Sequence, residues 1–580
     1  MKPGIKDLSS LIAYILTHRW RFIAGSVVLL LTNSFALLIP WVMKLAVEGL
    51  QHPATARFSP AFCAITIVLL AVAHCISRIF SRTLFLNAAR IIEFRIREDL
   101  FNKLLQLDQL FYAANRTGDI LSRFSNDLTN VRMLAGFGAM SAVNALIMYV
   151  ATVTLMLRIH PLLTVCAIIP FPLMVLVVKK VSNQMFQRSL ESQEELSRLS
   201  SMAEESVSTV RLIKSYCREE LFQGLFQDAS DRYLQCNLRL ARLRGMLLPV
   251  MAAATGMGTL IVLFMGGRLV IAEAITLGDF VAFSGYLAML VWPTAMLGWI
   301  LTLAQRGAAS MSRLAMIMNA EPSISDAPDA ELLERMCKEI ELRNLSFGYG
   351  KTRILHGISC IISAGERVGI TGEVGCGKTT LLKLMQRLLP VAEGEIFIDG
   401  LDINRITLKS LRALIGYVPQ EAFLFSRSIR ENIDYGSATG QERAEYLARR
   451  AGFAEDLGRF HEGLGTLVGE KGVTLSGGQK QRLSIARALS AEPDILLFDD
   501  PLSAVDAGRE EEILTELGHF CHGRTVLIVS HRLSAFRDCD RVLVLKDGVI
   551  EEEGSPAELL ERDGLYAALF KRQCLQEQLL

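Results

Sequence analysis

Long apolar runs dominate the first half of the chain, whereas the second half alternates short apolar runs with polar and glycine-rich segments. A helix that crosses a membrane needs roughly 20 mostly apolar residues. Runs of this length predict six spans, near residues 22–46, 61–81, 136–157, 161–179, 247–271 and 279–303. His74 and Arg78 interrupt the second run, so its inner end is the least defined boundary. Little more than residues 158–161 separates the third run from the fourth, which predicts a tight antiparallel hairpin.

Lysine and arginine mark one side of these predicted spans. They precede the first span and recur between spans two and three and between spans four and five, whereas the other connections are short and nearly uncharged. Because loops rich in Lys and Arg stay in the cytoplasm, the N-terminus and the second half of the chain are expected there. Residues 91–109 and 189–223 repeat apolar positions at helical spacing, which predicts helices that continue beyond the bilayer. The pattern predicts a multi-pass protein of the cell inner (plasma) membrane.

Composition fits a membrane protein that carries a soluble domain. Of the 580 residues, 51% are hydrophobic and 21% charged, and the formal net charge is +1. This balance, without a basic run, argues against nucleic-acid binding. The eleven cysteines show no C-x-x-C spacing and indicate reduced thiols. Residues 1–20 lack an apolar core followed by a small-residue cleavage site, so we expect no cleaved signal peptide.

The second half contains a phosphate-binding motif. Residues 372–380 read G-E-V-G-C-G-K-T-T and fit the pattern G-x-x-x-x-G-K-[ST]. Its glycines allow backbone N–H groups to surround phosphate oxygens, Lys378 places a charge on the β- and γ-phosphates, and the Thr379 hydroxyl ligates Mg²⁺. The helix that follows adds its N-terminal dipole. The apolar strand at residues 495–498 ends in Asp499, which we expect to support the magnesium. Cys376 needs no role of its own.

Between these two motifs lies Leu475-Ser-Gly-Gly-Gln479. In this order the three motifs resemble the ATP-binding cassette (ABC) proteins, and the six spans before them resemble an ABC exporter half-transporter. The resemblance implies a helical six-span domain with long cytoplasmic extensions over residues 1–318, a linker at 319–339, and an α/β P-loop ATPase domain at 340–580. The acidic, proline-containing stretch from Glu321 to Asp329 fits such a linker.

The same resemblance assigns further roles. Tyr349 stacks on adenine, Gln420 touches Mg²⁺ and the coupling helices, and His531 contacts the γ-phosphate. Residues 466–472 link the cassette to the coupling helices, which are expected at residues 118–127 and 205–216, and residues 503–506 reach the partner cassette. The full nucleotide-binding set is Tyr349, Gly372, Glu373, Val374, Gly375, Cys376, Gly377, Lys378, Thr379, Thr380, Ser476, Gly477, Gly478 and Gln479; the magnesium set is Thr379, Gln420 and Asp499; the catalytic set is Asp500, His531 and Gln420.

The resemblance also implies a dimer. In the family, Ser476, Gly477 and Gly478 would bind the γ-phosphate held by a partner cassette, so one chain is half of the transporter. Where the family places a catalytic glutamate, this chain has Asp500. Loss of one methylene withdraws the carboxylate by about 1 Å, and misplacement of that order can cost about a hundredfold in rate. This departure favours a degenerate-site subunit of a heterodimeric exporter over a homodimer.

Two kinds of function fit this architecture. The first is ATP-driven export of a hydrophobic or amphipathic compound, drug-like or lipid-like, and the second is an ATP-gated channel or receptor on the same scaffold. The spans bring no ring of charges for an ion pathway, but they do bring Asn33, Asn144, Thr255, Tyr286, Trp292 and Trp299 as a lining for apolar ligands. Export is therefore favoured, with membrane lipid and a hydrophobic small molecule as the expected contacts.

Overall fold

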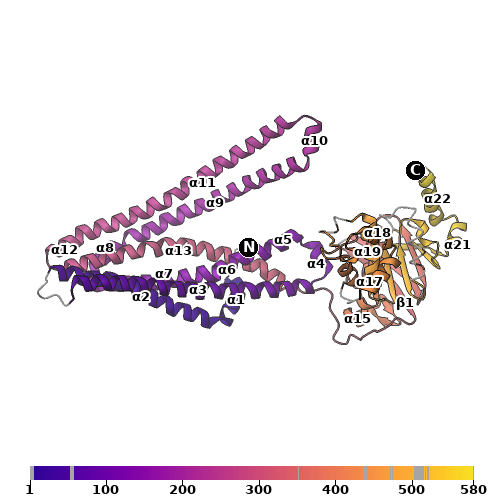
Figure 1. The fold of residues 1–580 in the computed structure, drawn as a ribbon, viewed down its shortest axis with the longest axis horizontal. Helices are drawn as coiled ribbons and strands as arrows, with labels where there is room; N and C mark the ends of the chain where they lie inside the picture. Colours follow the sequence, from indigo (N-terminus) through magenta and orange to yellow (C-terminus); the bar gives the residue numbers. More distant parts are fainter. Residues whose placement is uncertain are drawn as a thin grey trace. The chain divides into compact units, whose positions relative to one another are not determined.

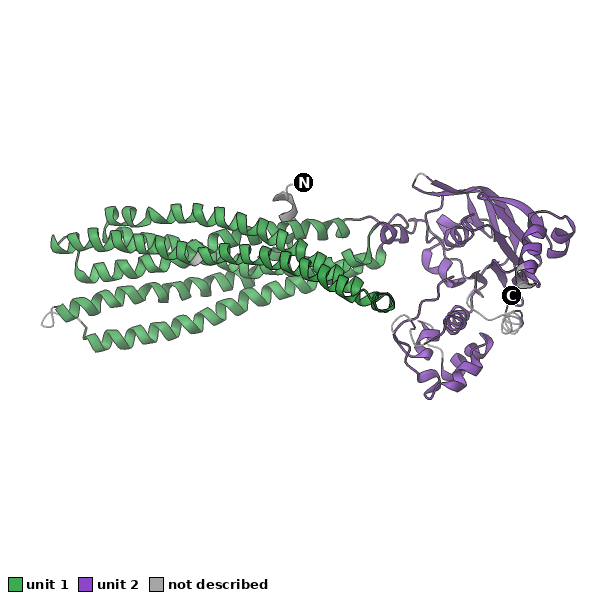
Figure 2. Cartoon of the chain, turned by 90° about the horizontal axis from the view of Figure 1, so that it is seen from above, with its two compact units in different colours: residues 1–106, 115–320 green, residues 107–114, 321–580 purple. Residues whose placement is uncertain are grey.

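The computed structural model describes residues 5–51, 58–350, 352–435, 440–469, 472, 475–501, 515, 518 and 521–578. The chain forms two compact units (Figure 2). Unit 1 comprises Met1–Gln106 and Asn115–Ala320, and unit 2 comprises Leu107–Ala114 and Glu321–Leu580. A short segment between the second and third predicted spans thus belongs to the C-terminal unit.

Unit 1 is helical (Figure 1). Proline and π-type turns interrupt its longer helices without ending them. Its elements are α1 (Ile5–Thr17), α2 (Arg19–Gln51), α3 (Pro60–Gln106), α5 (Thr117–Ser122), η1 (Arg123–Asp127), α6 (Leu128–Met133), η2 (Leu134–Gly138), α7 (Ala139–Ile159), α8 (Pro161–Ile168), α9 (Pro170–Ser208), α10 (Val210–Ser215), α11 (Glu219–Ile261), η3 (Val262–Gly266), α12 (Gly267–Ile271) and α13 (Leu277–Met318).

Six helical stretches of the described chain are long and apolar enough to cross a membrane, which confirms the six-span prediction. They are Arg19–Gln51, Pro60–Gln106, Thr117–Ile159, Pro161–Ser208, Glu219–Ile271 and Leu277–Met318. Most run well past the apolar segments, so the predicted helical extensions are also confirmed. The hairpin between α7 and α8 turns at His160, whose Nδ1 accepts a hydrogen bond from the Leu163 N–H at 3.2 Å and so caps α8.

Helix α13 is the central packing element of unit 1. It contacts α7, α2 and α6, and it buries Phe283 and Tyr286 in an apolar cluster. The Tyr286 hydroxyl donates to the Leu37 carbonyl at 3.2 Å, which satisfies its polar group inside the bundle. By contrast, α9 and α11 run side by side away from these helices and are joined at their tip by α10 (Figure 1).

Unit 2 contains two sheets. The first has the order β2-β1-β4-β5, and the second has the order β10-β9-β3-β8-β7-β6, in which the strands from β9 to β6 are parallel. The strands are β1 (Glu339–Tyr349), β2 (Thr352–Ser363), β3 (Arg367–Gly372), β4 (Ile396–Ile398), β5 (Leu401–Asp402), β6 (Ile415–Val418), β7 (Ile495–Asp499), β8 (Thr525–Val529), β9 (Arg541–Lys546) and β10 (Val549–Gly554).

Helices flank these sheets and complete an α/β unit, which confirms the predicted fold class. They are α4 (Gln109–Ala114), α14 (Lys378–Met385), α15 (Leu408–Ala413), α16 (Ile429–Asp434), α17 (Gln441–Arg450), α18 (Ala454–Arg459), α19 (Gly477–Ser490), α21 (Pro556–Glu561) and α22 (Leu565–Gln578). All five residues of β7 are buried, as expected for a strand covered on both faces. The carboxyl ends of β3, β6 and β7 meet at one edge, where parallel sheets bind ligands.

Candidate functional site

The loop between β3 and α14 has a shape that only glycine permits at two positions. Gly372 has φ +145°, and a Cβ there would lie 2.0 Å from the Leu545 carbonyl oxygen. Gly377 has φ +100°, and a Cβ there would lie 2.5 Å from the Leu355 side chain. The backbone therefore follows a tight path that brings its N–H groups to the start of α14. This geometry fits a bound phosphate chain.

Lys378 lies inside this loop. Its side chain is buried, and its Nζ donates hydrogen bonds to the carbonyl oxygens of Gly372 at 2.9 Å and Glu373 at 2.8 Å. The ammonium also lies 3.6 Å from the sulfur of Cys376, which is buried as well. The loop thus holds one positive charge at the place where the motif predicts phosphate.

Asp499 and Thr379 form an oxygen-rich pair next to the loop. Asp499 ends β7 and accepts hydrogen bonds from the Thr379 hydroxyl at 3.0 Å and from the Tyr417 hydroxyl at 3.3 Å. Burial raises the pKa of Asp499, and the two hydrogen bonds oppose that effect by stabilising the carboxylate. Hydroxyl and carboxylate oxygens are the ligands that Mg²⁺ prefers, so this pair fits the cation.

Asp500 and His531 lie at the ends of neighbouring strands. Asp500 is buried, has φ +48°, and donates its N–H to the Val529 carbonyl at 2.8 Å. Its Oδ1 accepts a hydrogen bond from the Ser530 hydroxyl at 3.3 Å. Partial burial of the His531 ring lowers its pKa, and the positive charge of Lys378 lowers it further, which favours a neutral imidazole. A buried carboxyl group and a neutral imidazole thus lie at the ends of neighbouring strands.

A cavity of about 530 Å³ connects the Thr379–Asp499 pair with Gln420 and α4. Thr379, Asp499 and Gln420 line it from the strand ends, and Gln109 and Tyr112 line it from α4. Leu110 of α4 packs against the apolar cluster beneath the sheet. The structure therefore brings Gln420 to the predicted magnesium pair, within one compact unit.

Asp108 anchors the start of α4. Its Oδ2 accepts hydrogen bonds from both the backbone N–H and the hydroxyl of Ser323, the former at 2.6 Å. Partial burial of Asp108 raises its pKa, but the hydrogen bonds from Ser323 and from the backbone of α4 outweigh it and hold the pKa below the usual value. The segment between the second and third spans and the linker after the sixth span are thus joined within unit 2.

The L-S-G-G-Q segment begins helix α19. Ser476 caps the helix: its hydroxyl accepts from the Gln479 N–H at 3.3 Å, and its own N–H donates to Gln479 Oε1 at 2.9 Å. Gln479 also donates to Asp456 at 2.9 Å. Leu475 and Cys376 belong to different apolar clusters, and among the described residues no hydrogen bond or ion pair joins residues 475–479 to residues 372–380. The signature segment and the phosphate loop are separate sites of this chain.

Comparison with known proteins connects this site to a family. Residues 22–294 match the ABC transporter transmembrane region, and residues 355–503 match the ABC transporter family. The probable multidrug resistance ABC transporter ATP-binding/permease protein YheI of Bacillus subtilis (strain 168) is 37% identical over 562 residues, which cover 96% of this chain and 95% of that protein. The multidrug resistance-like ATP-binding protein MdlA of Escherichia coli (strain K12) is 33% identical and covers 97% of this chain and 96% of its own.

The chain belongs to the ABC exporter half-transporters. A solved structure of a bacterial Atm1-family ABC exporter with ATP bound has a TM-score of 0.79 and 29% identity, and the match covers 96% of this chain and 98% of that one. The protein is an ATP-driven exporter subunit that binds and hydrolyses nucleotide, and exporters of this kind act as dimers.

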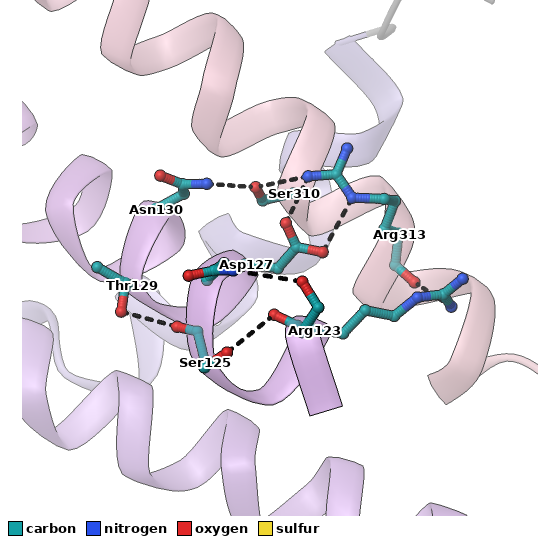
Figure 3. A network of polar contacts seen from close by, with 9 residues as sticks. Arg123, Ser125, Asp127, Thr129, Asn130, Ser310 and Arg313 are labelled. Carbon is teal, nitrogen blue, oxygen red and sulfur yellow. Dashed lines mark hydrogen bonds and ion pairs between the residues drawn. The ribbon is translucent and has the colours of Figure 1, made fainter. Parts of the chain in front are cut away.

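The structure differs from one prediction made from the sequence, the position of the first coupling helix. Residues 118–127, expected to be the first coupling helix, lie in unit 1 and pack against α13. Asp127 is buried, and both of its carboxylate oxygens accept hydrogen bonds from Arg313, from Nε at 2.9 Å, while Arg123 donates to the Arg313 carbonyl at 3.4 Å (Figure 3). The segment between the second and third spans that belongs to the ATPase unit is instead residues 107–114, which contain α4. The second coupling helix was expected at residues 205–216, and the short helix α10 lies within this segment.

The remaining predicted residues of the exporter are placed as follows. Tyr349 ends β1 with an exposed ring that packs edge-on against Phe347, with ring centroids 5.1 Å apart. Sequence reasoning missed Tyr417 and Ser530 as partners of the two aspartates; both sit in segments already singled out for Gln420 and His531. Ser503-Ala504-Val505-Asp506, together with Glu470 and Lys471 of the segment 466–472, lies outside the described residues.

Proposed function

We propose that this half-transporter uses ATP and Mg²⁺ to export hydrophobic or amphipathic compounds. The observation that carries the proposal is the fusion, in one chain, of a six-span apolar unit to an ATPase unit with an intact phosphate loop. The multidrug names of its relatives support such substrates. A further relative, 32% identical over 97% of this chain, is the ATP-dependent lipid A-core flippase of Syntrophus aciditrophicus (strain SB), which supports lipid-like substrates as well.

Each residue of the site receives a role in this proposal. Lys378 leaves the carbonyl oxygens of its own loop and binds the β- and γ-phosphates. Thr379 ligates Mg²⁺, with Asp499 and Gln420 beside it. His531 contacts the γ-phosphate, and Tyr349 stacks on the base. The bound magnesium supplies charge neutralisation for phosphoryl transfer.

The signature segment acts on a partner. Its N–H groups at the start of α19 form an anion-binding end. Within this chain, Leu475 of the segment and Cys376 of the phosphate loop belong to different apolar clusters. In a dimer, Ser476, Gly477 and Gly478 would complete the partner's site. ATP binding would then bring the two cassettes together, and hydrolysis would separate them. The membrane helices would follow this movement and open alternately to the two sides of the membrane.

The partner is proposed to be a different half-transporter. Asp500 provides a carboxylate one methylene shorter than glutamate, and its buried, left-handed backbone gives little freedom to compensate. A site built on Asp500 would mainly bind ATP, while the intact signature of this chain would complete an efficient site on the partner. The basic connections further support a cytoplasmic ATPase unit and an inner-membrane location.

Transport in proteoliposomes tests the proposal. This chain and its native partner, reconstituted together, are expected to accumulate a hydrophobic fluorescent compound only with Mg-ATP, and Lys378→Ala in this chain should reduce transport strongly. In the heterodimer, removal of the partner's catalytic carboxylate should stop turnover, whereas Asp500→Asn should have a much smaller effect. Compound flux that follows its own gradient without ATP consumption would instead indicate a channel.

A further inference from the structure

A second cavity lies inside unit 1, among α2, α3, α7 and α13. Its volume is about 340 Å³. Three of the residues expected from the sequence to line a ligand site do line it, namely Asn33, Asn144 and Trp292. Tyr286 does not, because it is buried in the neighbouring apolar cluster and bonded to Leu37.

One wall of this cavity is apolar and adaptable. Met140, Met148, Met289 and Met296 line it together with Trp292. Thioether side chains are flexible and polarisable, so they adjust to ligands of different shape. The indole of Trp292 is 61% exposed, which leaves it available for contact. This wall fits the apolar body of a ligand.

Another part of the cavity lining is basic. His74, Arg78 and Arg82 follow one another at intervals of four residues along α3 and all line the cavity. Residues spaced by four lie on one face of a helix, so the three form a stripe that points into the cavity. Asn33 adds polarity, since its Nδ2 donates to Asn144 Oδ1 at 3.0 Å.

The stripe reaches deep into the predicted membrane region. His74 Nδ1 lies 3.0 Å from the carbonyl oxygen of Thr32. Thr32 is ten residues beyond residue 22, where the first predicted span begins, which corresponds to about 15 Å of helix, half of a typical hydrocarbon core. Arg78 lies one turn nearer the basic end of α3 than His74, and Arg82 lies one turn further still. Arg78 therefore lies inside the second predicted span, residues 61–81, where an unpaired charge is costly, and Arg82 lies one residue beyond its end.

Among the described residues, no carboxylate pairs with these two arginines. Within the described part of the chain, neither Arg78 nor Arg82 forms an ion pair, and no acidic residue lines the cavity. Three other arginines on or near α3 do form ion pairs. Arg90, Arg97 and Arg132 all pair with the buried Glu93, at 3.2, 2.9 and 3.5 Å. These three arginines are thus paired with a carboxylate, whereas Arg78 and Arg82 line the cavity.

We propose that this cavity binds an amphipathic anion, with its carboxylate or phosphate on Arg78 and Arg82 and its apolar body against Trp292 and the methionines. The inference rests on the proposed export function and names the substrate class. Arginine suits this role because its planar guanidinium forms paired, charge-assisted hydrogen bonds to carboxylate and phosphate. Such an anion could come from a phospholipid or from a soluble amphiphile.

Equilibrium binding without ATP tests the inference independently of transport. The nucleotide-free protein in phosphatidylcholine nanodiscs is titrated with 11-dansylaminoundecanoic acid and with its methyl ester, and binding is followed by dansyl fluorescence. The acid is expected to bind at least about tenfold more tightly than the ester. Arg78→Gln with Arg82→Gln should remove this preference, the double Lys variant should keep most of it, and Arg95→Gln, an exposed arginine of α3 outside the cavity, should change nothing.

The source of the anion follows from competition. Displacement of the probe by didodecanoyl phosphatidic acid, but not by the matching phosphatidylcholine, would indicate a membrane lipid; displacement by dodecanoate alone would indicate a soluble amphiphile, and both outcomes support an anion site. Equal binding of acid and ester to the wild-type protein would overturn the inference, and this comparison holds even if the Gln variant fails to fold. Anion binding with no ATP-driven transport would reject the proposed function but not the site.

Discussion

At the scale of single residues, Lys378 supplies the positive charge of the phosphate loop. It is the residue whose ammonium lies within the phosphate loop, where two backbone carbonyls hold it at 2.8 and 2.9 Å. These neutral carbonyl acceptors are weaker partners than phosphate oxygens. They hold the lysine in place, and the phosphates of ATP can replace them as its hydrogen-bond acceptors. The glycines at 372 and 377 provide the path, and the lysine provides the charge.

Replacement of Lys378 by alanine is expected to abolish productive ATP binding at this cassette, because the loop loses its side-chain charge for the β- and γ-phosphates. Photolabelling with 8-azido-ATP measures this directly. Lys409→Ala, an exposed lysine of α15 in the same unit, serves as the matched control and should label like the wild type. Wild-type labelling of the Lys378 variant would show that the loop does not bind nucleotide as assigned.

The pair of Asp127 and Arg313 gives a prediction on stability. Asp127 is buried, whereas the Arg313 side chain is 46% exposed. Arg313→Ala leaves a buried carboxylate without its cation and should cost about 1–3 kcal/mol, whereas Asp127→Ala leaves an arginine that can reach solvent and should cost less.

Thermal unfolding of the detergent-solubilised protein, at one scan rate, compares these variants. The midpoint should fall most for Arg313→Ala and less for Asp127→Ala. Arg123→Ala is the control, since this residue makes only a 3.4 Å contact to a backbone carbonyl, and its midpoint should stay close to the wild type. Equal shifts for all three would mean that the ion pair contributes nothing beyond packing.

At the scale of elements, α4 is the short helix that joins the nucleotide cavity to the chain that follows α3. Its Tyr112 and Gln109 line the cavity that contains Gln420 and the Thr379–Asp499 pair. This helix lines the nucleotide cavity and follows the membrane helix α3 in the chain, so we propose that it couples ATP hydrolysis to transport.

Tyr112→Ala is therefore expected to lower ATP-driven transport several-fold while basal ATPase activity stays within about twofold of the wild type. Both activities are measured on the same reconstituted dimer. Asp119→Asn, on the neighbouring helix α5 of unit 1, is the control and should affect neither. Loss of coupling in Asp119→Asn with normal coupling in Tyr112→Ala would return the interface to residues 118–127.

The sequence predicted some of these elements and not others, for physical reasons. The spans were predictable because lipid requires long apolar helices, and the phosphate loop because only glycine follows its backbone path at positions 372 and 377. Helix α4 was missed because it has six residues, too few to show a period, and Leu110 and Phe111 look like a continuation of α3. The spacing of His74, Arg78 and Arg82 is visible in the sequence, but the direction of their face depends on tertiary packing.

At the scale of the whole molecule, the chain carries surfaces that a dimer would use. Helix α10, at the tip of the α9–α11 pair, exposes Val210, Leu212 and the adjoining Tyr216. Likewise, among the described residues no hydrogen bond or ion pair joins the signature segment to the phosphate loop of its own chain. Both features suit an exporter in which each chain completes the ATP site of the other. In the proposed heterodimer, Asp500 would make the two ATP sites unequal in their rate of hydrolysis.

The rate of ATP hydrolysis by this chain purified without a partner tests the proposed asymmetry most directly. Wild-type turnover should be slow, and Asp500→Glu should raise it about ten- to a hundredfold, because the longer side chain brings the carboxylate about 1 Å closer to the attacking water. Adding Lys378→Ala to the Glu variant should return the rate to background. Fast, drug-stimulated hydrolysis by the wild-type homodimer, unchanged or reduced by Asp500→Glu, would contradict the asymmetry and make Asp500 an ordinary catalytic carboxylate.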